Sequence, residues 1–412
     1  MSEGTNPTPW VAPGKWTVCL HDFEPEVRKE WHLPARVRVH DVTLRDGEQW
    51  PGVVFTRDEK LRIAHALADL GVDRIEGGMA SVSQEDADAI TAMSREIKTA
   101  EICAFTRARR DDVELAIKCG VRRLIVEVPA LRAQLARIWG TPEKAAEQFV
   151  GLADFAAGYG VKVTLFLMEA SRADVDFLKR IIVPSVKQAK IDSIGLVDTR
   201  GSALPQAMAW LVSTIKPVVG NLPIEVHVHD IWGMATATTL AAVAAGAEVI
   251  HGAVNGLNGN AALEECVMGV HALLGVETGM NTQGFTALSK LVREASGVDW
   301  YKPFVGPLVN AVEVGITTQM MWDRRDEPNY GRGDLLNFEL LGAKAYEVVM
   351  GKKSGASSVL LKARDLGLPE PDRATAGKIL SEVKALSMRE KRAVSDDEFR
   401  MIYDSIAEPV QR

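Results

Sequence analysis

Apolar residues in this chain recur in eight short runs between residues 37 and 273, and segments with helical spacing separate most of them. The runs cover residues 37–44, 72–79, 101–106, 123–128, 162–168, 193–197, 224–229 and 249–254. Regular alternation of strand and helix predicts a parallel sheet covered by helices. Eight units in about 240 residues match the size of a closed (β/α)₈ TIM barrel. An open doubly wound sheet is the alternative, but no Gly-rich phosphate loop follows the first apolar run.

With 412 residues, the chain is too long for one small core and also exceeds the length of this barrel, so we expect additional segments outside the barrel. We expect residues 1–36 to form an N-terminal arm that packs on the barrel or on a second subunit, since the arm carries three tryptophans. Residues 37–280 are predicted to form the barrel. Residues 281–412 are predicted to form a small, mainly helical post-barrel subdomain.

Charge and hydropathy exclude several classes of partner. The net charge is −7 and no long basic run is present, so nucleic acid and anionic membranes are not expected partners. No apolar stretch approaches the roughly 20 residues that span a bilayer. The N-terminus lacks the basic and apolar regions of a secretory signal, and the four cysteines form no CxxC pair. A reducing cytoplasm is the expected location.

Polar residues follow the ends of the predicted strands, where a (β/α)₈ barrel carries its active site. They are Arg45 and Asp46, Glu76, Arg107, Glu169 and Arg172, Asp198 and Thr199, His227 and His229, and 255–260. Because the carboxyl ends of all eight strands meet at one face, this distribution predicts an enzyme. His40 and His251 are expected to pack as ordinary barrel residues, since neither has a ligand partner at useful spacing.

Asp46 and the His227-Val228-His229 run together predict a metal site. Side chains alternate along a strand, so both imidazoles point to the same face. Two imidazoles and one carboxylate suit a divalent cation such as Mg²⁺, Mn²⁺ or Zn²⁺. Arg45, beside the carboxylate, would place a fixed cation where an enolate or carboxylate substrate could be held.

Two segments resemble signatures of a known family. The Leu44-Arg45-Asp46-Gly47-Glu48-Gln49 segment closely resembles the first signature of the metal-dependent 2-isopropylmalate, homocitrate and citramalate synthases. His227-Val228-His229-Asp230 looks like their second signature. These synthases belong with hydroxymethylglutaryl-CoA lyase to the DRE-TIM metallolyase superfamily. The resemblance covers the whole predicted barrel and extends through 351–355 into the post-barrel helices.

The resemblance implies roles for ten side chains. It makes Asp46, His227 and His229 the metal ligands, with Asn260 as a further ligand or near neighbour. It gives Arg45 to the substrate carbonyl and developing enolate, with Glu76 beside it and Gln49 orienting groups near the metal. Thr199 and Arg107 would contact the substrate carboxylate. Glu169 joins the substrate-binding candidates, although Glu169 and Arg172 could instead brace the loop after the fifth strand.

The reaction that this resemblance implies is a Claisen-type condensation of an acyl-CoA with a 2-oxo acid, in a homodimer. The chain departs from the pattern after the barrel, where the synthases supply a histidine. The last histidine here is His271, and Glu313-Val314-Gly315-Ile316-Thr317 occupies the corresponding stretch. Either Glu313, Tyr330 or another residue replaces that histidine, or the chemistry differs. The alternatives are an aldol or retro-Claisen lyase acting on a 2-hydroxy acid or its CoA ester, and a catalytically silent homologue.

Overall fold

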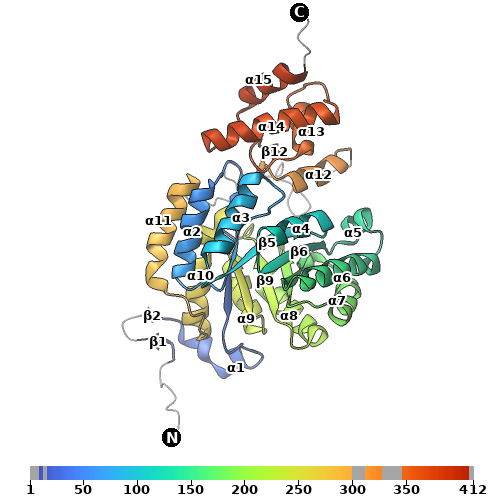
Figure 1. Ribbon diagram of the computed structural model, residues 1–412. Helices are drawn as coiled ribbons and strands as arrows, with labels where there is room; N and C mark the ends of the chain where they lie inside the picture. Colours follow the sequence, from blue (N-terminus) through green and yellow to red (C-terminus); the bar gives the residue numbers. More distant parts are fainter. Residues whose placement is uncertain (1–8, 13–15, 299–310, 327–345, 408–412) are drawn as a thin grey trace, which may run out of the picture. The chain divides into compact units, whose positions relative to one another are not determined.

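The eight predicted strands close into a parallel barrel. The computed structural model describes residues 9–12, 16–298, 311–326 and 346–407 (Figure 1). The barrel strands are β3 (Arg38–Asp41), β4 (Arg74–Glu76), β5 (Glu101–Arg107), β6 (Arg123–Pro129), β7 (Lys162–Met168), β8 (Ser193–Asp198), β9 (Ile224–Val228) and β10 (Val249–Gly252). Neighbours along the chain are neighbours in the sheet, and β10 pairs with β3 to close it. The predicted TIM barrel is therefore confirmed.

Helices follow the strands and cover the outside of the barrel, as Figure 1 shows. They are α2 (Arg57–Asp69), α3 (Gln84–Glu96), α4 (Arg110–Lys118), α5 (Arg132–Ile138), α6 (Pro142–Gly158), α7 (Val175–Gln188), α8 (Pro205–Val219), α9 (Ala235–Ala244) and α10 (Leu263–Gly269). Several begin where a short polar side chain satisfies an otherwise unpaired backbone N–H group, as Ser83, Thr141 and Asp174 do. Within the described ranges, no helix combines the length and the apolar character that a membrane crossing needs.

The chain divides into two compact units. The first contains residues 1–45 and 61–289, and therefore holds the barrel strands together with the N-terminal β1 (Val11–Ala12), β2 (Trp16–Thr17) and α1 (Pro25–Arg28). The second contains residues 46–60 and 290–412. The segment 46–60 thus groups with the post-barrel residues although it lies within the range predicted for the barrel. The predicted boundaries at residues 36 and 280 remain a proposal about domain organisation.

The second unit has a hydrophobic core of its own. Its elements are β11 (Ala311–Val312), α12 (Gly315–Asp323), β12 (Glu347–Val348), α13 (Ala356–Asp365), α14 (Arg373–Glu390) and α15 (Asp396–Ala407). β11 and β12 pair in parallel, and Val359, Ile379 and Phe399 are among the fully buried residues between the helices. α11 (Phe285–Ser296) contains the boundary between the two units.

Helix α8 offers a matched test of the barrel's packing. Met208 is 0% exposed and Trp210, two residues away, is 61% exposed. We expect Met208→Ala to lower the free energy of unfolding by about 2–5 kcal/mol, because it leaves a cavity. Trp210→Ala should change it by no more than about 0.5 kcal/mol. Urea-induced unfolding followed by circular dichroism measures both, and equal losses would contradict this placement of α8.

Candidate functional site

Two imidazoles converge at the carboxyl end of β9. His227 lies in the strand and His229 follows it, and their Nε2 atoms are 3.2 Å apart. His227 is buried and His229 is half-buried. Two ring nitrogens at this distance either share a proton or face a common cation, because two lone pairs would repel. The donor set at this strand end therefore fits a metal ion.

Asn260 lies directly beside His229. The two residues form an antiparallel backbone bridge, and the Asn260 amide group donates from Nδ2 to the carbonyl oxygen of Leu257 at 2.9 Å. Asn255 and Asn258, in the loop before it, adopt left-handed backbone conformations that asparagine tolerates better than most residues. This loop places Asn260, which is 1% exposed, next to the imidazole pair.

Arg45 follows β3 and is held by a buried carboxylate. Its Nε donates to Glu76 Oε1, and the guanidinium group lies 4.3 Å from the centre of the Phe105 ring. The other oxygen of Glu76 accepts from His40 Nε2 at 3.0 Å. Burial alone would raise the pKa of Glu76, but the charge of Arg45 and the His40 hydrogen bond outweigh burial and lower it. Glu76 is therefore an ionised, fully buried support for Arg45.

A line of packed rings connects Arg45 to the imidazole pair. Phe105, which lies under the guanidinium group, packs edge-on against Phe166, with ring centres 5.8 Å apart. Phe166 in turn packs against His227 at 5.4 Å. The cation and the two imidazoles therefore lie around the same aromatic layer of the barrel interior.

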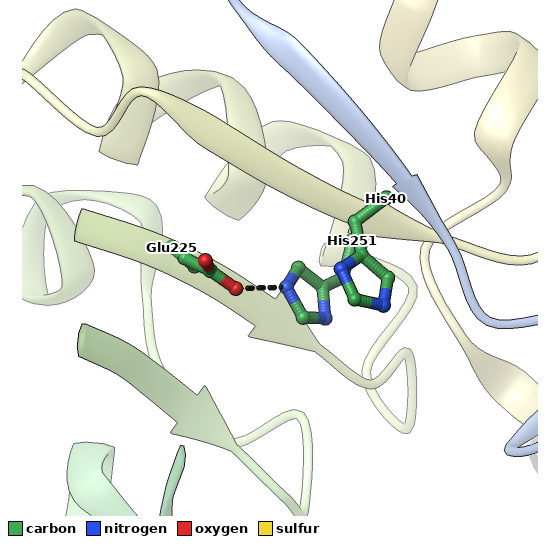
Figure 2. Close-up of side chains that lie close together, drawn as sticks. All are labelled: His40, Glu225 and His251. Carbon is green, nitrogen blue, oxygen red and sulfur yellow. Dashed lines mark hydrogen bonds and ion pairs between the residues drawn. The ribbon is translucent and has the colours of Figure 1, made fainter. Parts of the chain in front are cut away.

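A second group of buried imidazoles lies deeper in the barrel (Figure 2). His40 and His251 stack with their ring centres 4.1 Å apart, and His251 Nε2 lies 2.9 Å from Glu225 Oε2. Both histidines thus have carboxylate partners, on other strands, which the spacing within the sequence did not reveal. Burial, followed by the proximity of His251, lowers the pKa of His40 to about 4, so His40 is neutral near pH 7.

His40, Glu225 and His251 lie close enough together to hold a metal ion, but their chemistry argues against one. Glu225 already pairs with the buried Arg74, and stacked rings direct their in-plane lone pairs side by side instead of toward one point. A divalent ion there would add charge to a fully dehydrated, already compensated group. We therefore assign these residues a structural role under the site.

The strand ends of β7 and β8 carry a second polar group. The backbone N–H of Glu169 donates to Thr199 Oγ1 at 2.9 Å. Because the Thr199 hydroxyl accepts this bond, its own hydrogen is left to donate to a ligand. Glu169 also pairs with Arg172 and Arg200 through its two carboxylate oxygens. The predicted bracing of this loop by Glu169 and Arg172 is present, and it includes a second arginine that sequence reasoning missed.

Arg107 ends β5 and forms a two-point pair with Asp112, the fifth residue after it. Its Nε and Nη2 donate to the two carboxylate oxygens of Asp112 at 2.7 and 2.8 Å. These hydrogen bonds, more than the opposing effect of burial, raise the pKa of Arg107. The pair fixes the start of α4, and a contact from Arg107 to the substrate stays a prediction.

The segment 46–60, which carries Asp46 and Gln49, is held within the second unit by lysines. Glu48 Oε1 accepts from Lys352 Nζ at 2.9 Å, and Glu48 Oε2 pairs with Lys60 Nζ at 2.7 Å. All three side chains are buried. Lys352 belongs to the 351–355 segment that resembles the synthases. That resemblance does not by itself indicate the contact between Lys352 and Glu48.

Glu313, considered above as a replacement for the post-barrel histidine, is part of the same support. It is 1% exposed, and its carboxylate accepts from the backbone N–H groups of Gly52 at 2.9 Å and Lys353 at 3.1 Å. The Lys353 ammonium group lies 3.3 Å from it. With its oxygens engaged in this way, Glu313 braces the 46–60 segment. Tyr330, the other candidate, lies outside the described residues.

Comparison with known proteins agrees with this geometry. Residues 36–292 match the HMGL-like family model. Homocitrate synthase AksA of Methanopyrus kandleri is 35% identical over 393 residues, which cover 93% of this chain and 96% of that protein. A probable 2-isopropylmalate synthase of Ignicoccus hospitalis is 35% identical over 388 residues, or 92% of this chain and 95% of that protein.

Among solved structures, an HMG-CoA lyase from Acinetobacter baumannii, in complex with coenzyme A and 3-methylmalate, superposes with a TM-score of 0.58. Its identity to this chain is 19%, and the match covers 64% of this chain and 92% of the lyase, so it shows the shared fold. The family match and the nearly full-length similarity to two synthases lead to one conclusion: the chain belongs to the HMGL-like family, within the DRE-TIM metallolyase superfamily.

Proposed function

We propose that this protein is a metal-dependent enzyme that condenses an acyl-CoA with a 2-oxo acid. The single observation that carries the proposal is the convergent His227–His229 pair, which lies in the same barrel interior as the Arg45–Glu76 pair. The relatives named as homocitrate and 2-isopropylmalate synthases, which match nearly the whole chain, support it.

The proposed ligands of the metal ion are Asp46, His227 and His229, with Asn260 as a further ligand or neighbour. Asp46 follows Arg45 directly in the chain, and consecutive Cα atoms are about 3.8 Å apart, so its backbone stays close to the Arg45 turn. One carboxylate and two imidazoles suit Mg²⁺, Mn²⁺ or Zn²⁺. When bound, a divalent ion would polarise the carbonyl and carboxylate of the 2-oxo acid as a Lewis acid.

Arg45 is the proposed stabiliser of the transition state. A general base takes a proton from the α-carbon of the acyl-CoA, and that carbon attacks the carbonyl carbon of the 2-oxo acid, which places negative charge on the carbonyl oxygen. Arg45, held in place by Glu76, would donate hydrogen bonds to that oxygen until it takes up a proton. Water then hydrolyses the thioester, which releases the CoA thiol and a new carboxylate.

The remaining candidates would orient the substrate. The free hydrogen of the Thr199 hydroxyl suits the 2-oxo acid's carboxylate, and we place Arg107 at the same group. Gln49, on the segment held by Glu48 and Lys352, would orient groups near the metal. Glu169 would act through the arginines that it pairs with, since both of its oxygens are already engaged.

A carbon–carbon lyase is the second candidate. Its support is the absence of any histidine beyond His271 in the sequence, together with the structural engagement of Glu313. Such a lyase would cleave a 2-hydroxy acid or its CoA ester. Arg45 and the imidazole pair would serve the lyase as well, because cleavage also places negative charge on the carbonyl oxygen.

Metal content tests the ligand set. We expect elemental analysis of the purified protein to find about one divalent ion per chain, and His229→Ala to lose most of it because one donor is removed. His65→Ala is the matched control, since His65 is an exposed histidine on α2 that pairs with Glu96. Metal-free wild-type protein, or equal losses in both variants, would refute the proposed centre.

Thiol release tests the direction of the reaction. With a panel of acyl-CoA and 2-oxo acid pairs, at least one pair should release CoA faster than background in a sulfhydryl assay. Arg45→Gln should lower that turnover by about 100- to 1000-fold, the usual cost of losing one such donor. Cleavage of a 2-hydroxy acid to a 2-oxo acid, with no CoA release from any pair, would favour the lyase instead.

The proposal includes the homodimer that the family resemblance implies. We expect light scattering at micromolar concentration to give a mass near twice the chain mass of 44.8 kDa. A mass equal to that of one chain under these conditions would contradict it.

A further inference from the structure

Asp46 and Gln49 lie on one side of a single short turn. Asp46 precedes the 3₁₀ helix η2 (Gly47–Gln49), and the backbone N–H of Gln49 donates to the carbonyl oxygen of Asp46 at 2.9 Å. In a 3₁₀ turn, side chains three residues apart project from the same face. Glu48 projects from a different face, so a contact that fixes the Glu48 side chain limits the rotation of the whole turn.

Three donors anchor the Glu48 carboxylate. It accepts from Lys352 Nζ at 2.9 Å and from the backbone N–H of Phe55 at 2.9 Å, and it pairs with Lys60 Nζ at 2.7 Å. Glu48 is 4% exposed, and both lysines are 1% exposed. Solvent screens a buried ion pair little, and removal of one partner leaves a dehydrated, uncompensated charge. The Glu48 side chain is therefore fixed, and η2 is fixed with it.

Lys352 belongs to the 351–355 segment, and the next residue of that segment holds the same loop. Lys353 Nζ donates to the carbonyl oxygen of Trp50 at 3.1 Å and also to that of Val53. Both carbonyl groups belong to the loop that follows η2. Two consecutive lysines thus hold η2 and the loop directly after it.

The other residues of the 351–355 segment allow this approach. A Cβ added to Gly351 would overlap Glu313 Oε1, and one added to Gly355 would lie 2.9 Å from the Cα atom of Gly315. The Ser354 hydroxyl accepts from the backbone N–H of Gly351 at 2.9 Å, which closes the segment into a turn. Each position therefore has a structural reason, and together they bring the two lysines to η2 and its loop.

We propose that the 351–355 segment, through the Lys352–Glu48 pair, positions the proposed metal ligand Asp46 and so sets the affinity of the protein for its metal ion. This inference rests on the proposed function. Glu48 and Lys352 are positioning residues, since they act on the metal through the turn. A carboxylate that is already held in one orientation loses less conformational entropy when a cation binds. Groups that orient metal ligands in this way typically contribute about 10- to 100-fold to metal affinity.

The affinity of the full-length protein for Mn²⁺ tests the inference, with paramagnetic resonance of the free ion as the readout. Lys352→Met keeps an unbranched side chain and leaves Glu48 paired with Lys60. We expect it to weaken Mn²⁺ binding about 10-fold. Glu48→Gln removes the charge that both lysines face, and we expect about 100-fold. The double variant should bind no more weakly than Glu48→Gln, because the two residues act as one pair.

Lys362→Met is the matched control. Lys362 is another buried lysine of the second unit, and its Nζ pairs with Asp396 at 2.7 Å. This variant should lower the melting temperature as Lys352→Met does, but leave the Mn²⁺ affinity unchanged. Wild-type Mn²⁺ affinity in Lys352→Met, or equal losses of affinity in Lys352→Met and Lys362→Met, would overturn the inference while the proposed function stands. If the wild-type protein binds no Mn²⁺, or His229→Ala binds it as tightly as wild type, the proposed metal centre fails and this inference fails with it.

Discussion

The arrangement of the barrel interior depends on the two contacts of the buried Glu76 carboxylate. This carboxylate joins Arg45, which would meet substrate, to His40, which belongs to the deeper layer of histidines. A buried carboxylate is costly unless it is paired and hydrogen-bonded. Here both oxygens are used, so Glu76 can rotate only if it breaks a contact. Glu76, which these two contacts hold in place, therefore sets the orientation of Arg45.

The barrel interior contains two polar layers with different charge balance. In the deeper layer, the cations Arg74 and Arg123 face the carboxylates of Glu225 and Glu101, and His40, whose pKa burial lowers to about 4, adds no charge near pH 7. At the strand ends, by contrast, Arg172 and Arg200 share a single carboxylate, and two imidazole nitrogens approach within 3.2 Å. Under the proposed function, the substrate and the metal ion would therefore bind at the strand-end layer.

Sequence patterns predicted the barrel because each strand is buried on both faces and each covering helix on one. The run at 162–168 matches β7 fully, and the run at 123–128 ends within a residue of β6. Contacts between distant strands were not predictable in this way. His40, Glu225 and His251 lie on three strands, and no spacing along the chain relates them. The sequence indicated the pairing of Glu169 with Arg172, which is three residues away. It did not indicate the pairing of Glu169 with Arg200, which is distant in the sequence.

Glu313 lies in the stretch that corresponds to a histidine-containing segment of the synthases, but its contacts are those of a structural residue. Position in the sequence suggested that Glu313 could replace a catalytic histidine, but its carboxylate is surrounded by Lys353 and two backbone N–H groups. Its two oxygens are thus engaged in contacts that hold the backbone at Gly52 and Lys353. Its effect on the reaction would be indirect: it fixes the backbone at Gly52, on the segment that also carries Asp46 and Gln49. A residue can thus occupy the position of a catalytic group and serve the site by holding a loop.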